Sequence, residues 1–173
     1  MHHHKESRVL PYTPTQVFDM VADIEKYPDF LPWCTSAKIV ERKPGEEIAD
    51  LQIGYGPLRE TYTSKVMLER PRRIEVVGIK GPFKFLDNVW EFSAEKSSGA
   101  RSPRDVGCKV DFTIDFAFKS FFLQTMMGAV FHRAVHHMVA SFEARAAALY
   151  RDAPKTKHGA EGSSLRGAAR RAP

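Results

Sequence analysis

The segment CKVDFTIDFAF, residues 108–118, decides the fold class. Its even-numbered positions carry Cys, Val, Phe, Ile, Phe and Phe, whereas positions 109, 111, 113 and 115 carry Lys, Asp, Thr and Asp. Because successive side chains of a strand point to opposite faces, this alternation predicts a strand with one apolar and one solvated face. A sheet with one apolar face needs a second layer to cover it.

Residues 122–150 supply this second layer. The segment contains no proline, and its apolar side chains recur at helical spacing. They occupy positions 123, 127, 130, 134, 138, 142 and 149, and positions 126, 131, 135 and 139 widen the stripe. A broad apolar stripe on one helix can be covered by a single antiparallel sheet that curves around it. The two segments therefore predict an α+β fold with a bent sheet around a long C-terminal helix.

The rest of the chain predicts further strands and two short helices. Thr13 followed by Pro14 is typical of a helix start, and the two prolines within residues 23–33 allow only a short broken helix or turn there. Alternating runs bounded by Gly, Pro or charged turns predict the other strands of a sheet of about seven. These runs are residues 6–11, 38–41, 49–55, 58–68, 74–79 and 85–92.

Composition indicates one domain, residues 1–150, followed by a basic tail, residues 151–173. The chain has 173 residues, of which 43% are hydrophobic and 27% charged, as in ordinary globular proteins. We expect the tail to be disordered, because Leu165 is its one large aliphatic residue. Residues 95–107 are rich in Gly, Ser and charged residues and predict an exposed hairpin connection.

Charge and targeting signals narrow the possible partners and location. Of the net charge of +5, +4 lies in residues 151–173, so the folded part is nearly neutral and DNA is not an expected partner. No apolar run approaches the roughly 18 residues that span a bilayer, and the first ten residues lack the features of a signal peptide. We expect a cytoplasmic protein in which Cys34 and Cys108 are buried thiols.

The sequence offers no catalytic residue and no metal site. His132 and His136 lie one helical turn apart, but Arg133 stands where a zinc protease motif has Glu, and a third ligand is missing. The run from His2 to His4 lies at the chain terminus, where we expect no metal either. A P-loop, a dinucleotide glycine motif and a nucleophile elbow are absent. We therefore expect a protein without enzymatic activity that requires no cofactor.

Three ordered blocks resemble a known family. The segments YPDFLPWC (27–34), ADLQIGYGPLRETYTSKV (49–66) and CKVDFTIDFAFKS (108–120) with HHMVASFEARA (136–146) are similar to the coenzyme Q-binding START-like proteins. The resemblance implies the helix-grip fold and a non-catalytic carrier or chaperone of ubiquinone, or a similar polyprenyl lipid, that supports respiration. The related ribosome association toxins imply an alternative, a factor that binds the ribosome and blocks subunit association.

A quinone needs apolar walls, aromatic faces and a hydrogen-bond donor or two. We expect such a cavity inside the sheet, with Glu60 as an unusual carboxylate in phase with the inward residues of its strand. Ordinary core packing is the alternative for each of these side chains. The candidate ligand-binding residues are Trp33, Leu51, Ile53, Tyr55, Glu60, Tyr62, Trp90, Phe92, Phe112, Ile114, Phe116, Met127, Val130, Phe131, Ala134 and Met138.

A carrier of a bilayer lipid must also meet the membrane, here the inner membrane of a bacterium. Exposed aromatic rings beside lysine suit a membrane interface. The candidate contacts lie in two predicted turns, the hairpin after Gly81 and the turn into the long helix. They are Phe83, Lys119, Phe121 and Phe122. The alternative is that these rings cap the core.

Overall fold

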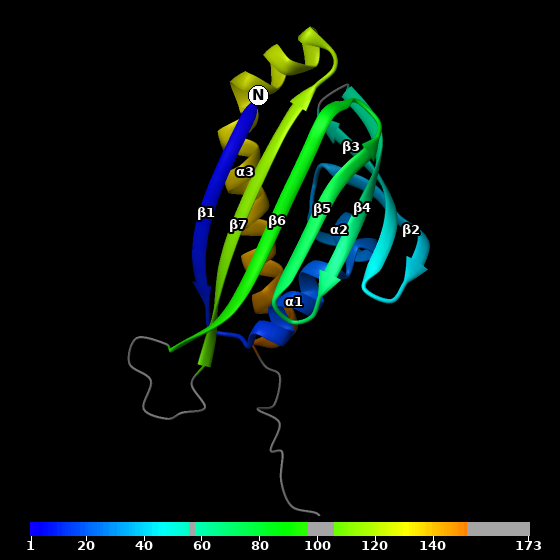
Figure 1. Ribbon diagram of the computed structural model, residues 1–173. Coiled ribbons are helices and arrows are strands. Elements are labelled where there is room, and N and C mark those ends of the chain that lie inside the picture. Colours follow the sequence, from blue (N-terminus) through cyan, green and yellow to red (C-terminus); the bar gives the residue numbers. More distant parts are fainter. Residues whose placement is uncertain (56–57, 97–105, 152–173) are drawn as a thin grey trace, which may run out of the picture.

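Seven antiparallel strands form one curved sheet in the order β1-β7-β6-β5-β4-β3-β2 (Figure 1). The computed structural model describes residues 1–55, 58–96 and 106–151. The strands are β1 (His2–Leu10), β2 (Cys34–Lys43), β3 (Glu46–Tyr55), β4 (Leu58–Glu69), β5 (Arg73–Lys80), β6 (Phe83–Lys96) and β7 (Val106–Phe118). The tail and most of the connection predicted at 95–107 lie outside the described residues.

The helices cover one face of this sheet. Helix α3 (Phe121–Tyr150) runs along the sheet, and α1 (Pro14–Ala22), a 3-10 turn (Ile24–Lys26) and α2 (Tyr27–Phe30) follow β1 (Figure 1). This arrangement confirms the predicted α+β helix-grip architecture, including the short helices after the first strand.

Helix α1 begins where the sequence predicts. The Thr13 hydroxyl accepts a hydrogen bond from the backbone N–H of Gln16 at 3.2 Å, and the Gln16 side chain accepts one from the Thr13 N–H at 2.9 Å. Pro14 follows at the first helical position, where its missing N–H costs nothing. The reciprocal bonds satisfy two backbone donors and orient the apolar face of α1 toward the sheet.

The first strand is longer than the alternation predicts. The sequence pattern predicts residues 6–11, whereas β1 begins at His2 and ends at Leu10. Strand β7 provides the reason, because it pairs with β1 along its whole length, from His2 opposite Phe116 to Leu10 opposite Cys108. The histidine run therefore belongs to the sheet and is not a frayed end.

The C-terminal half of α3 is fixed to the core by aromatic contacts. The ring of Phe142 lies 5.5 Å from that of Tyr27, 5.2 Å from that of Phe30 and 5.1 Å from that of Trp90. Near the helix end, the Tyr150 hydroxyl donates to the Gln16 carbonyl of α1 at 2.9 Å. These contacts join α1, α2, α3 and β6 at one end of the molecule.

We expect Phe142→Ala to lower the free energy of unfolding by about 3–5 kcal/mol, because the cavity it leaves removes contacts with several rings. Leu149→Ala is the matched control on the same helix, where the side chain is exposed and a change within about 0.5 kcal/mol is expected. Urea denaturation measures both values. Equal effects of the two substitutions would contradict the view that α3 is held through Phe142.

Candidate functional site

Two adjoining apolar chambers lie between α3 and the sheet. The outer chamber, about 210 Å³, reaches the end of the molecule where β7 passes into α3 and includes Phe83, Phe118 and Met127 in its lining. The inner chamber, about 120 Å³, extends toward α1 and α2 and includes Ile24 and Tyr27. The two chambers adjoin, because six residues line both of them: Trp33, Ile53, Tyr62, Leu86, Ile114 and Met138.

Most of the candidate ligand-binding residues line these chambers. The outer chamber contains ten of them: Trp33, Ile53, Glu60, Tyr62, Ile114, Phe116, Met127, Phe131, Ala134 and Met138. The inner chamber adds Leu51, Trp90 and Phe112. Alternation along the strands and the helical repeat of α3 bring these side chains to one interior space.

Three candidates are not placed at the chambers. Phe92 is buried and packs edge-to-face on Phe18 of α1 at 5.6 Å, so it belongs to the solid core. Val130 is half-buried on α3 but lines neither chamber. The side chain of Tyr55 lies outside the described part of the structure. Helical spacing alone does not separate the part of a helix that lines a cavity from the part that packs beside it.

Several polar and aromatic residues that line the chambers were not predicted from the sequence. Ser64 and Asn88 line the inner chamber, and Phe118 lines the outer one. Extending the alternation would have found them, since Ser64 lies two residues after Tyr62 and Asn88 lies two before Trp90. Ser64 and Asn88 are polar, and polar side chains usually face solvent, so the structure was needed to show that they face the chamber.

Two polar groups of the inner chamber have protein partners. The side chain of Asn88 donates to the Thr113 carbonyl at 3.2 Å and accepts from the Trp90 indole N–H at 2.7 Å. The Tyr27 hydroxyl donates to the Val21 carbonyl at 2.6 Å. These hydrogen bonds satisfy groups that would otherwise be costly to bury.

The titratable groups beside the inner chamber stay protonated at neutral pH. Burial raises the pKa of the Cys34 thiol to about 11, and burial likewise raises the pKa of the Tyr62 hydroxyl. A protonated thiol is a poor nucleophile, whereas a protonated phenol is a hydrogen-bond donor. Cys34 and Cys108 are free and buried, which confirms the expectation of two buried thiols.

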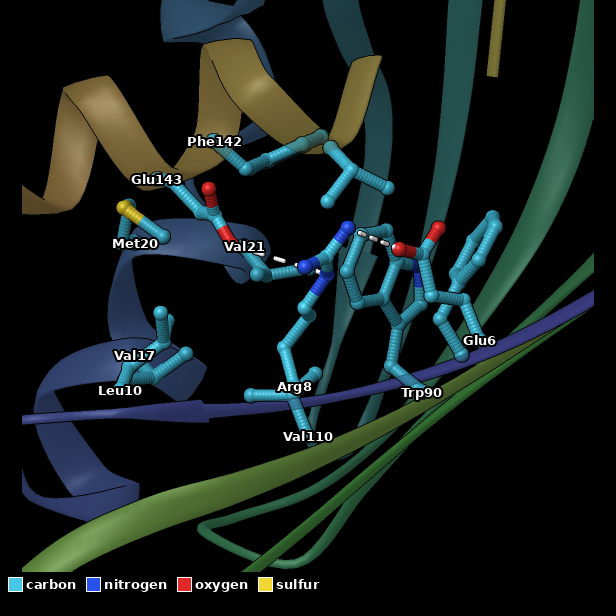
Figure 2. Close-up of a pocket in the computed structure, with 12 residues that line it drawn as sticks. Glu6, Arg8, Leu10, Val17, Met20, Val21, Trp90, Val110, Phe142 and Glu143 are labelled. Atoms are coloured by element: carbon cyan, nitrogen blue, oxygen red, sulfur yellow. Dashed lines mark ion pairs between the residues drawn. The ribbon is translucent and has the colours of Figure 1, made fainter. Parts of the chain in front are cut away.

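A third, smaller cavity of about 40 Å³ lies between β1, α1 and α3 (Figure 2). Arg8 extends between Glu6 and Glu143, with an ion pair to each; its Nε lies 3.8 Å from Glu143 Oε1. His4 Nε2 lies 3.0 Å from the other oxygen of Glu6. Burial by itself raises the pKa of Glu6, but the bonds from His4 and Arg8 outweigh it and lower the pKa. The space is small beside the two chambers, and these charges join β1 to α3.

Polar residues of metal-binding type do not gather elsewhere in the described ranges. Among these residues, no three His, Cys, Asp or Glu side chains lie close enough to hold a metal ion. His132 and His136 are exposed on α3.

The candidate membrane contacts divide into two groups. Phe121 is 85% exposed and Phe122 68% exposed, so these rings do not cap the core. Phe83 instead faces the outer chamber, where its ring stacks on Phe118 at 4.9 Å and meets the Tyr62 ring edge-to-face at 5.3 Å. Lys119 is exposed, and its ammonium donates to the Gly81 carbonyl at 2.9 Å, which ties the two turns together.

No helix among the described residues is long and apolar enough to cross a bilayer.

The sequence of the chain matches a family model described as polyketide cyclase / dehydrase and lipid transport over residues 10–143. The chain belongs to this family. A ribosome association toxin, RatA, from Rickettsia prowazekii is 35% identical over 146 residues, which cover 82% of this chain and 94% of the toxin. The mitochondrial coenzyme Q-binding protein COQ10 homolog B of Xenopus laevis is 33% identical over 85% of this chain and 59% of that protein.

Solved structures agree with the family assignment at the level of the fold. An aromatase/cyclase from Streptomyces sp. R1128 superposes with a TM-score of 0.73 over 88% of this chain and 98% of its own, at 17% identity. Family membership and this likeness confirm the START-like resemblance of the sequence. The same fold thus carries enzymes in other proteins, so the lining of the cavity has to decide what this chain does.

The buried hydroxyl of Ser64 generates a prediction for the empty protein. Ser64 is 1% exposed and its Oγ has no hydrogen-bond partner among the described residues. We expect Ser64→Ala to raise the free energy of unfolding by about 1 kcal/mol, because a buried hydroxyl without a partner costs about that much or more. Thermal and urea melts of ligand-free protein measure the change, with Ser93→Ala on an exposed position of β6 as the control. A clear loss of stability in Ser64→Ala would contradict the unpaired state of this hydroxyl.

Proposed function

We propose that this chain binds ubiquinone or a similar polyprenyl lipid in the two chambers, and that it carries or protects the molecule without changing it. The observation that supports the proposal is the pair of adjoining apolar chambers, which are walled by aromatic rings and contain few polar groups, the usual composition of a lipid or cofactor site. The name of the COQ10 relative points to the same ligand. Ubiquinone is the bound ligand in this proposal, and a further cofactor is not required.

The lining also supports a binding role over catalysis. Among the described residues that line the two chambers there is no histidine, lysine or aspartate. Acid–base catalysis needs a positioned pair of titratable groups, and nucleophilic catalysis needs an activated nucleophile. Glu60 stands without such a partner, and the raised pKa of Cys34 leaves its thiol unreactive.

One end of the molecule has the character of a membrane-contacting surface, which we call the docking end. The exposed rings of Phe121 and Phe122 follow Lys119, which is hydrogen-bonded to the turn at Gly81 and Pro82. Two further exposed lysines, Lys80 and Lys84, flank that turn. Aromatic rings insert at headgroup depth and lysines attract anionic lipids. The outer chamber lies at the same end, because Phe83 and Phe118 line it, so peripheral contact with the inner membrane would place the cavity against the bilayer.

Protein purified from a ubiquinone-producing host should contain quinone approaching about one molecule per chain, since ligand cavities of this kind are few per protein. Ala134→Phe fills the outer chamber and should reduce the extracted quinone to background. Ala140→Phe, on the exposed side of α3, is the matched control and should retain it. Organic extraction followed by mass spectrometry gives the result. Background quinone in the unmodified protein, together with no uptake of added quinone, would exclude the proposal.

The double variant Phe121→Ser with Phe122→Ser should bind anionic vesicles at least about threefold less, while its free energy of unfolding changes by less than about 0.5 kcal/mol, because both rings are exposed. Leu149→Ser alters an exposed apolar side chain at the opposite end of α3 and should leave vesicle binding unchanged. Vesicle flotation and thermal melting measure the two quantities. A large loss of stability without a flotation defect would contradict docking through this end.

A second candidate function is binding to the ribosome and blocking of subunit association. The names of several relatives, among them the toxin from Rickettsia prowazekii, favour it. The basic residues after 150 are suited to phosphate contacts. Sedimentation of whole ribosomes with the purified protein separates the two functions. Dissociation into subunits would favour the ribosomal role, and an unchanged profile is expected for a quinone carrier.

A further inference from the structure

The inward face of β4 carries a row of polar side chains through an otherwise apolar cavity. Glu60 lines the outer chamber, Ser64 lines the inner one, and Tyr62 between them lines both. The neighbouring strand β3 has apolar residues at the paired positions: Ile53 opposite Glu60, Leu51 opposite Tyr62 and Ala49 opposite Ser64. We call Glu60, Tyr62 and Ser64 the polar stripe.

The stripe differs from the other polar groups of the cavity because its members lack protein partners. Asn88 and Tyr27 are hydrogen-bonded within the protein, as described above. The Ser64 hydroxyl is buried and unpaired, and neither the Glu60 carboxylate nor the Tyr62 hydroxyl has a hydrogen bond or ion pair with any described residue. Ser64 is buried and Glu60 and Tyr62 are half-buried. A buried hydroxyl without a partner is costly, so the row, with Ser64 at its inner end, points to a ligand that pairs with it.

The chemistry of Glu60 selects one oxidation state of such a ligand. A carboxylate accepts hydrogen bonds and donates none, whereas a hydroxyl does both. The two oxygens of a quinone are acceptors, so a quinone oxygen beside Glu60 would place acceptor against acceptor. A hydroquinone has hydroxyl groups at the same positions and can donate to Glu60, while Tyr62 and Ser64 can serve either form.

The spacing of the stripe suits a ring with oxygens on opposite sides. Residues two apart on a strand are about 7 Å apart along its axis and point to the same face. A six-membered ring that lies along β4 therefore presents its two oxygens to neighbouring members of the stripe. The apolar side chains on both sides of the stripe would then pack against the faces of the ligand ring.

We propose that the polar stripe makes the cavity selective for the hydroquinone form of its ligand, with the Glu60 carboxylate accepting a hydrogen bond from one ring hydroxyl. The inference rests on the proposed function and adds to it the oxidation state of the ligand. Hydrogen bonds to charged groups are strong enough to produce a preference of at least about tenfold.

Binding of decylubiquinol and decylubiquinone under anaerobic conditions tests the proposal. Trp33 and Trp90, both tryptophans of the chain, line the chambers, so quenching of their fluorescence reports occupancy. The unmodified protein should have a Kd for the quinol at least about tenfold below that for the quinone. The midpoint potential of the bound couple should rise by about 30 mV for each tenfold of preference.

Variants assign the preference to Glu60. Glu60→Gln should bring the two Kd values to within about threefold, because an amide both donates and accepts. Ser64→Ala should weaken both forms alike and preserve their ratio. Glu91→Gln, at an exposed position of β6, is the matched control and should change neither value. Should Glu60→Gln fail to fold, Glu60→Asp retains the charge at a shorter reach and should reduce the preference without reversing it.

The outcomes distinguish this inference from the function on which it rests. Absence of binding by either form would overturn the proposed function. Binding of both forms with equal Kd in the unmodified protein would overturn the quinol preference and leave the carrier role standing. A preference that persists undiminished in Glu60→Gln would overturn the assignment to this carboxylate.

Discussion

The packing of the C-terminal half of α3 against the core is the constraint on which the rest of the structure depends. Phe142 and Ala146 are buried in the C-terminal half of the helix, where Phe142 packs against Tyr27, Phe30 and Trp90. In the N-terminal half, Met127 and Ala134 line open space instead. A core packed to ordinary density along the whole helix would leave no such space. Leu123 and Phe131 are buried in the same half of the helix, so the open space lies beside Met127 and Ala134 and between points at which the helix is packed.

The edge strand β1 is joined to α3 by charged side chains. Strand β1 has no neighbour on its outer side among the described strands, and its inward side chains include His4, Glu6 and Arg8. Arg8 bridges to Glu143 of α3, so an ionic contact joins strand and helix in addition to the ring contact of His2 with Phe131 at 5.1 Å (Figure 2). A partly exposed ion pair contributes little to stability but fixes geometry, which suits an edge strand that must stay in register with β7.

The architecture could be predicted from the sequence because the strand alternation and the helical repeat are both regular. The period of two in β7 and the helical repeat of α3 gave the sheet and the helix that it surrounds, and the START-like resemblance gave their topology. Period alone was insufficient where a residue's chemistry conflicts with its position. The strand at His2–His4 was not predicted because its pairing with β7 is not visible in the local sequence. The inward position of Ser64 was not predicted because polar side chains normally face solvent, whereas Ser64 lines a cavity. Phe92 packs on Phe18 and does not line a chamber, which the alternation could not predict because an inward aromatic ring can face either a neighbouring helix or a cavity.

The sizes of the chambers bear on how a polyprenyl lipid would be held. About 210 Å³ and 120 Å³ accommodate a ring and a short length of chain, but not an extended polyprenyl tail. Each buried methylene contributes about 0.8 kcal/mol, so a tail left in water would cancel much of the gain from burying the ring. On the proposed function, the ring therefore enters first along the polar stripe, and the tail trails toward the docking end, where Phe121 and Phe122 are exposed. On the same proposal, a cavity too small for the whole ligand accounts for the exposed apolar rings at the docking end, because the protein would shelter the ring of the lipid and leave the tail to the bilayer.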